Sequence, residues 1–260
     1  MNPSLPIDVL SAVPTLEAGR ARVEIPDGWQ QGRGLFGGLV AALQIRALEQ
    51  VAPDRPLRSL TSELCGPVQP GDAELVVEVL RAGNAVTTAA VRLVQHGEVQ
   101  AHGVGVLGKD RVPGVRATIV PPAIRPWRDV PALPSLGGFR PTFAQHLEFR
   151  PTGPLPFAGG SEPRVEGWVR WKQPGTRRDA AYLAACIDAH WPALFSIEPA
   201  PRPMATIAFT FQPLGTPGDA VYYRGTLVAQ DAGYCVEFRE LWSEDGHLLA
   251  LNQQTFAVIK

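Results

Sequence analysis

The chain has 260 residues, of which 45% are hydrophobic and 19% are charged, so it can bury a sizeable core and bulk disorder is not expected. Its 24 Lys and Arg residues face 25 Asp and Glu residues, which gives a formal net charge of −1. A nearly neutral chain without a basic run lacks the electrostatic footprint of a nucleic-acid-binding protein, so we expect no nucleic-acid partner.

The N-terminal segment predicts neither a signal peptide nor a membrane span. It has no basic stretch, and Pro6 and Pro14 interrupt its apolar residues. The sequence contains no run of about 18 apolar residues, so we expect no membrane partner. Cys65, Cys186 and Cys235 form neither a disulfide framework nor a CxxC motif. This cysteine usage is typical of a reducing compartment and predicts a cytoplasmic protein.

The first half of the chain predicts a short strand, one helix and several long strands. The strand covers residues 21–25, and the helix covers Phe36–Val51. In the segments that follow, apolar residues alternate with polar ones, as Val77 and Val79 do, and Gly, Asn and Asp turns separate the segments.

A Pro-rich segment then divides the chain. Neither a helix nor a central strand tolerates the many prolines between residues 113 and 141. We therefore expect an extended linker over residues 113–141, with an N-terminal repeat over residues 1–112 and a C-terminal repeat over residues 142–260.

The two halves resemble each other in the order of their parts. The second half predicts a helix over Asp179–Trp191, followed again by strands with period-two alternation. The PGD of residues 70–72 recurs at residues 217–219, and the turn glycine Gly97 recurs as Gly246. A repeat of this length indicates two copies of one supersecondary unit.

The two predicted helices are apolar on nearly every side and rich in alanine, over Leu39–Ile45 and Leu183–Ala189. A helix that is hydrophobic all round must be buried all round. One such helix followed by long antiparallel strands describes a sheet wrapped round a helix, which predicts the α+β class. Two copies would pair edge to edge, extending the sheet and removing two exposed edges.

The sequence argues against two common kinds of site, a dinucleotide-binding site and a metal site. The glycines of residues 32–37 match GxGxxG, but residues 26–31 separate them from the preceding strand and no alternation of parallel strands and helices follows. We interpret them as the start of a tightly packed helix rather than a dinucleotide site. The five histidines are scattered without metal-ligand spacing, so we expect no metal.

Asp188 interrupts the apolar pattern of the second helix. An ionised carboxylate is costly among apolar residues, and Pro192 places Asp188 close to a helix C-terminus, where negative charge is disfavoured. Both effects raise the pKa of a carboxyl group, which makes Asp188 a candidate general base. The alternative is a capping or hydrogen-bonded structural Asp.

Two polar residues lie in the strands that follow. Thr206 occupies one strand, and strict alternation predicts that it faces away from Phe209. Gln254 occupies the last strand and shares a face with Asn252 and Phe256.

With these residues the chain resembles the double-hotdog acyl-CoA thioesterases of the type II (TesB-like) family over nearly its whole length. Phe36–Gly38 matches the family's FGG at the start of the first helix. Asp188, Thr206 and Gln254 match the helix Asp, the strand Thr and the late Gln that hold the attacking water in that family.

The resemblance implies a double hotdog, in which two tandem repeats each wrap an antiparallel sheet round a central helix. It implies hydrolysis of a fatty acyl-CoA to the free acid and coenzyme A, without a cofactor. It also implies a homo-oligomer, a dimer of double hotdogs.

Two other functions remain open. Ile187 replaces the small polar residue that often precedes the Asp in this family, which leaves a non-catalytic acyl-CoA or apolar-ligand binding protein as the alternative. A hotdog hydratase carries a His five residues after its Asp, where this chain has Ala193, so the hydratase ranks last.

The first repeat lacks the three site residues. The aligned first-half positions carry Gln44, Leu60 and Gly105. A carboxamide cannot act as a base near neutral pH, so we expect one active site per chain, in the second repeat.

Overall fold

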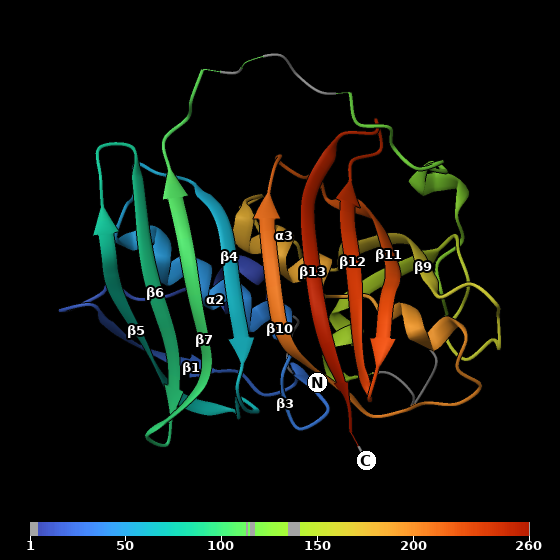
Figure 1. The fold of residues 1–260 in the computed structure, drawn as a ribbon, viewed down its shortest axis with the longest axis horizontal. Coiled ribbons are helices and arrows are strands. Elements are labelled where there is room, and N and C mark those ends of the chain that lie inside the picture. Colours follow the sequence, from blue (N-terminus) through green and yellow to red (C-terminus); the bar gives the residue numbers. More distant parts are fainter. Residues whose placement is uncertain (1–4, 113, 115–117, 135–140, 260) are drawn as a thin grey trace.

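The computed structural model describes residues 5–112, 114, 118–134 and 141–259. Eleven strands form one curved antiparallel sheet in the order β1-β5-β6-β7-β4-β10-β13-β12-β11-β9-β8, and the helices α2 and α3 lie side by side behind it (Figure 1).

The elements of the first half begin with a short helix and end with three long strands. They are α1 (Ile7–Leu10), β1 (Arg20–Ile25), β2 (Gln30–Gln31), β3 (Gly34–Leu35), α2 (Gly37–Gln50), β4 (Leu57–Leu64), β5 (Gly71–Ala82), β6 (Val86–Gln95) and β7 (Glu98–Gly108).

The second half repeats this order after two short 3-10 helices. Its elements are η1 (Trp127–Asp129), η2 (Thr142–His146), β8 (Leu147–Pro151), β9 (Arg164–Trp171), α3 (Ala180–Ile187), η3 (Ala193–Ser196), β10 (Met204–Pro213), β11 (Ala220–Asp231), β12 (Tyr234–Trp242) and β13 (Leu248–Val258).

The two halves join through β4 and β10. These strands pair antiparallel, with Leu60 opposite Phe211 and Glu63 opposite Ala208. The pairing removes the exposed edge that each half would otherwise present. The double hotdog and its edge-to-edge junction are therefore confirmed.

The central helices are buried on every side, as the sequence predicts. Every residue of α2 from Gly38 to Leu48 is buried, and so is every residue of α3 from Ala181 to Ile187. A Cβ built on Gly38 would lie 3.0 Å from Ala185 Cα, so a glycine is needed where the two helices cross. Small residues thus allow two apolar helices to share one core.

The second helix is shorter than predicted. It ends at Ile187 instead of Trp191, and Asp188 is its C-cap. Pro192 disfavours the helical conformation at the residue before it, and a separate 3-10 helix begins at Ala193. The predicted position of Asp188 near a helix C-terminus is confirmed.

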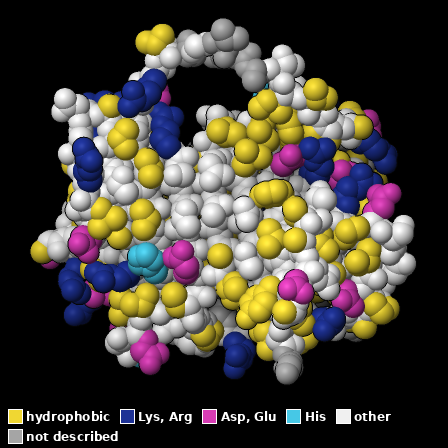
Figure 2. Space-filling view, viewed as in Figure 1, with side chains coloured by type: hydrophobic (Ala, Val, Ile, Leu, Met, Phe, Trp, Pro, Cys, Tyr) yellow, Lys and Arg dark blue, Asp and Glu magenta, His cyan; other side chains and the backbone are white. Residues whose placement is uncertain are grey.

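Much of the outer face of the sheet is open to solvent, and hydrophobic side chains are spread over its second half (Figure 2). On β12, Val236 and Phe238 belong to this face, and Phe238 is 50% exposed. The alternating positions Cys235, Glu237 and Arg239 are turned into the core and are buried. The apolar residues of this strand therefore mark its outer face, and two charged residues occupy its inner face.

Part of the expected linker packs against the second half of the sheet. Val130 belongs to one buried cluster with Trp168, whose Nε1 donates to the Arg125 carbonyl at 2.8 Å. The Arg150 guanidinium lies 4.1 Å from the centroid of the Trp127 ring. Residues 113, 115–117 and 135–140 of the expected linker lie outside the described residues.

The GxGxxG segment forms no dinucleotide fingerprint. Its glycines lie in and after the short antiparallel pair β2–β3, and all described strand pairs of the main sheet are antiparallel. A Cβ on Gly34 would lie 2.9 Å from Pro67 Cα, so this glycine serves close backbone packing, as the sequence suggests.

Candidate active site

Asp188 lies where the end of α3 meets the start of α2. Its side chain is only 7% exposed. Oδ1 accepts a hydrogen bond from Gln254 Nε2 at 2.7 Å, and the carboxylate also accepts one from the Gly38 backbone N–H. These donors fix the carboxylate at the junction of the two repeats.

Thr206 and Gln254 join Asp188 in one hydrogen-bonded chain. Thr206 Oγ1 donates to Gln254 Oε1 at 3.1 Å, and the Gln254 amide nitrogen in turn donates to Asp188. The structure thus brings together the three residues that the sequence singled out from a helix and two strands.

The predicted orientation of Thr206 was wrong. Its register with β13 shifts between Thr206 and Ala208, so Ile207 is an extra residue on that strand. Such a bulge breaks the alternation. Thr206 pairs with Phe256, and Phe209 pairs with Gln254, so both residues of β10 face the interior with Gln254. Without the bulge, Thr206 would point away from the site.

Two buried charged residues complete the cluster, and sequence reasoning missed both. Arg239 Nη1 lies 3.3 Å from Asp188 Oδ1 and 3.3 Å from the Ile187 carbonyl, and Arg239 Nε donates to Glu237 Oε1 at 2.9 Å. The signal was present, since charges at two successive inward positions of a strand are costly in a core unless they are paired.

The environment of Asp188 perturbs its titration. Burial raises the pKa of Asp188 above its usual range; Arg239, the Gln254 amide and the Gly38 N–H act in the opposite direction, and Glu237 reinforces the increase. A carboxylate with a raised pKa, oriented by the Gln254 amide, the Gly38 N–H and Arg239, is suited to accept a proton.

The N-terminus of α2 presents backbone donors at this point. Its N-cap, Phe36, makes no side-chain capping bond, and the Gly38 N–H donates to Asp188 instead. A Cβ on Gly37 would lie 2.9 Å from Asp188 Oδ2. Glycine therefore leaves room beside the carboxylate, close to the positive end of a helix dipole.

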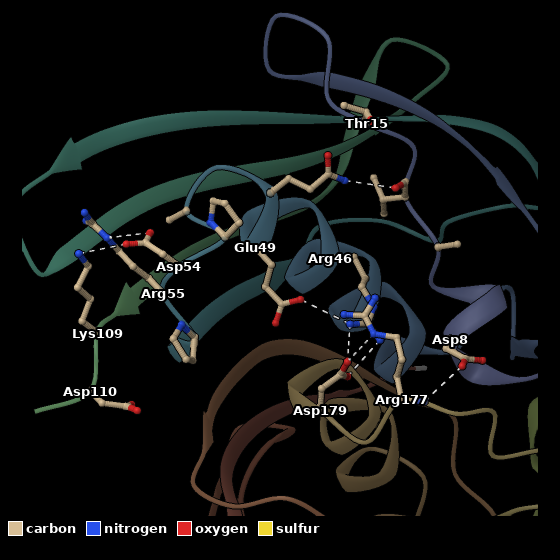
Figure 3. A pocket seen from close by; sticks show the side chains of 16 residues that line it. Asp8, Thr15, Arg46, Glu49, Asp54, Arg55, Lys109, Asp110, Arg177 and Asp179 are labelled. Atoms are coloured by element: carbon tan, nitrogen blue, oxygen red, sulfur yellow. Dashed lines mark hydrogen bonds and ion pairs between the residues drawn. The ribbon is translucent and has the colours of Figure 1, made fainter.

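The opposite end of the helix pair is different. There a pocket of about 970 Å³ is lined by charged side chains, among which Arg46 and Asp179 point toward each other (Figure 3). Arg46 Nη1 donates to Asp179 Oδ2 at 2.7 Å, and Asp179 also caps α3 by accepting from the Tyr182 N–H. The N-terminal N–H of α3 is thus already occupied. None of the predicted site residues lines this pocket.

The first half contains no counterpart of the carboxylate. Gln44 is buried, and its Oε1 accepts from Ser62 Oγ at 2.8 Å. Leu60 is buried, and a Cβ on Gly105 would lie 2.6 Å from Leu48 Cδ1. Among residues 5–112, no buried side chain is acidic.

Within the described part of the chain, no three His, Cys, Asp or Glu side chains gather as a metal site. No helix of these residues combines the length and apolar character that crossing a membrane requires. Cys186 and Cys235 are buried free thiols, and Cys65 is exposed.

Comparison with known families identifies the class. Residues 25–108 match the acyl-CoA thioesterase N-terminal domain, and residues 121–258 match the acyl-CoA thioesterase C-terminal domain. The chain therefore belongs to the acyl-CoA thioesterase family, and it is a thioester hydrolase. The comparison with curated proteins finds no match.

Solved structures show the same fold. A hot dog fold protein of unknown function from Alicyclobacillus acidocaldarius is 22% identical, with a TM-score of 0.88 and 98% of each chain covered. A putative thioesterase II from Thermobifida fusca is 22% identical, with a TM-score of 0.87 and 100% of each chain covered. The acyl-CoA thioesterase II TesB2 of Mycobacterium marinum is 19% identical, with a TM-score of 0.78 and 97% of this chain and 98% of that chain covered.

Proposed function

We propose that the protein hydrolyses a fatty acyl-CoA through a water activated by Asp188 and oriented by Thr206 and Gln254. The observation that carries the proposal is the chain of hydrogen bonds from Thr206 through Gln254 to Asp188, which ends beside the uncapped start of α2. A base and backbone donors thus lie within one small region, as acyl transfer to water requires.

The reaction balances with these groups alone. The water oxygen attacks the thioester carbonyl carbon while Asp188 accepts one water proton. The tetrahedral intermediate collapses, the C–S bond breaks, and the leaving thiolate of coenzyme A takes the proton from Asp188. The products are the free acid and the thiol, and the carboxylate is regenerated.

The developing oxyanion needs a donor, and we assign this role to the Gly37 N–H at the start of α2, because the Gly38 N–H already donates to Asp188. Gly37 and Gly38 carry no side chain that would keep a carbonyl oxygen away from the backbone. A helix N-terminus favours negative charge. The corresponding end of α3 cannot serve in the same way, because Asp179 already accepts from its backbone.

Release of free thiol from a panel of acyl-CoA esters tests the proposal. We expect steady thiol release with at least one chain length, measured with a colorimetric thiol reagent. Saturable binding of the same esters without any thiol release would instead indicate a binding protein of this fold.

We expect one active site per chain. Because Gln44 and Ser62 form a neutral buried pair where a base would be needed, Gln44→Ala should retain most of the activity per folded molecule. A non-hydrolysable acyl-CoA analogue should titrate to about one equivalent per chain in calorimetry. Two equivalents of tight binding, or a loss at Gln44 as large as that at Asp188, would contradict this assignment.

We further propose that the protein acts in the cytoplasm. We also propose that it forms a dimer of double hotdogs. Each chain would have repeats over residues 1–112 and 142–260, joined by a linker over residues 113–141. The three free cysteines support the reducing compartment. The family resemblance supports the oligomer.

A further inference from the structure

Arg239 is an unusual residue for the inside of a sheet. Its side chain is 1% exposed, and its guanidinium contacts two carboxylates, Asp188 on one side and Glu237 on the other. Removing an ion from water is expensive, so a fully buried arginine persists where its partners are well placed. One positive charge is therefore paired with two negative charges within the core.

Glu237 is bound more extensively than Asp188. Its Oε2 accepts from the Ala193 backbone N–H at 2.8 Å, and its Oε1 accepts from Tyr223 Oη at 3.2 Å and from Arg239 Nε at 2.9 Å. These three donors fix Glu237 as the anchor of the guanidinium. Arg239 then reaches Asp188 and the Ile187 carbonyl with its Nη1, which ties the end of α3 to β12.

We propose that Arg239, which Glu237 anchors, is the positioning residue that keeps the buried Asp188 charged and oriented. Glu237 weakens the attraction between Arg239 and Asp188. Arg239 and Glu237 together therefore set the pH at which Asp188 becomes active as a base. The inference rests on the proposed function of Asp188. It assigns no contact with substrate to either residue.

The other groups around Asp188 do not titrate near neutral pH. From β11, Tyr223 faces the cluster, and burial raises the pKa of Tyr223 well above its usual value. After α3, burial lowers the pKa of His190 to about 3, so this ring is neutral. From α2 and β13, the contacts that Asp188 receives are the Gly38 N–H and the neutral amide of Gln254. The charges that act on Asp188 are thus those of Arg239 and Glu237.

The two charges should move the pH profile in opposite directions. Glu237→Gln removes a negative charge that opposes ionisation of Asp188. The acidic limb of the pH profile of kcat/KM should therefore move to lower pH by about one pH unit. Arg239→Met removes the positive charge that favours ionisation, so the limb should move to higher pH by at least about one unit. In the double variant the shifts should largely cancel.

A matched control exists on the same strand. Glu240 lies on the outer face of β12 and binds Arg224 Nε at 2.7 Å. Glu240→Gln should leave the acidic limb in place, because this pair faces away from Asp188. The same variants should be followed by carbon NMR titration of the Asp188 carboxyl group, assigned with Asp188→Asn.

Thiol release tests the proposed function, and the NMR titration tests the positioning role of Arg239 and Glu237 separately. If the wild-type protein releases no thiol, the proposed function fails, but the NMR titration still measures the effect of each variant on Asp188. If thiol release occurs and Glu237→Gln folds without moving either the limb or the carboxyl titration, the positioning role is wrong. Shifts of both single variants in the same direction would also overturn it. Should Arg239→Met fail to fold, Glu237→Gln alone decides.

Discussion

Asp188→Asn should reduce turnover by a factor of about 10²–10⁴ and leave the fold intact, because a positioned base contributes roughly this much. Asparagine keeps the size of the side chain and can still accept from Gln254, while Arg239 retains its bond to Glu237. The rate of thiol release per folded molecule is the measurement, and the melting temperature reports on the fold.

Asp179→Asn is the matched control, since Asp179 lies at the other end of the same helix. Asparagine can still cap α3, but it loses the ion pair with Arg46, so the substitution should lower the melting temperature but not the turnover of the folded protein. The assignment of Asp188 fails if its variant releases thiol at the wild-type rate, or if the two variants behave alike.

Thr206→Val and Gln254→Leu should each lower turnover by about 10²–10³, the usual cost of removing one donor that orients or stabilises reacting atoms. Thr206 donates to Gln254 and Gln254 donates to Asp188, so the three residues would hold the attacking water as one unit. The losses should therefore be far from additive when the substitutions are combined with each other or with Asp188→Asn.

Thr210→Val provides the control for this series. Thr210 lies on the same strand, and its hydroxyl accepts from the Gln253 backbone on the exposed side of the sheet. Its loss should leave turnover nearly unchanged. Additive losses at Thr206, Gln254 and Asp188, measured as log kcat in the multiple variants, would mean that these residues do not share a site.

Much of the fold could be predicted because its strongest signals are local. The all-apolar, alanine-rich stretch around Leu183 required a buried helix, and a carboxylate at Asp188 in that stretch required an explanation. The repeat of turns and strands supplied the architecture. These features depend on short segments that can be interpreted one at a time.

Features that depend on two distant segments could not be predicted in the same way. The bulge at Ile207 reverses the orientation of Thr206, and it becomes apparent only from the register with β13. On β12, apolar residues such as Phe238 occupy the exposed face, so the inward charges of Glu237 and Arg239 were not recognised. Their partners lie on other elements, which no local pattern specifies.

The junction of β4 and β10 places the two repeats in one continuous sheet, and the candidate site uses both. Gly37 and Gly38 come from the first repeat, while Asp188 comes from the second. In an assembly of two identical chains, every substitution would appear in both copies at once. Within one polypeptide each repeat can change alone, so one copy can specialise in donating backbone groups and the other in providing the base, always in a one-to-one ratio.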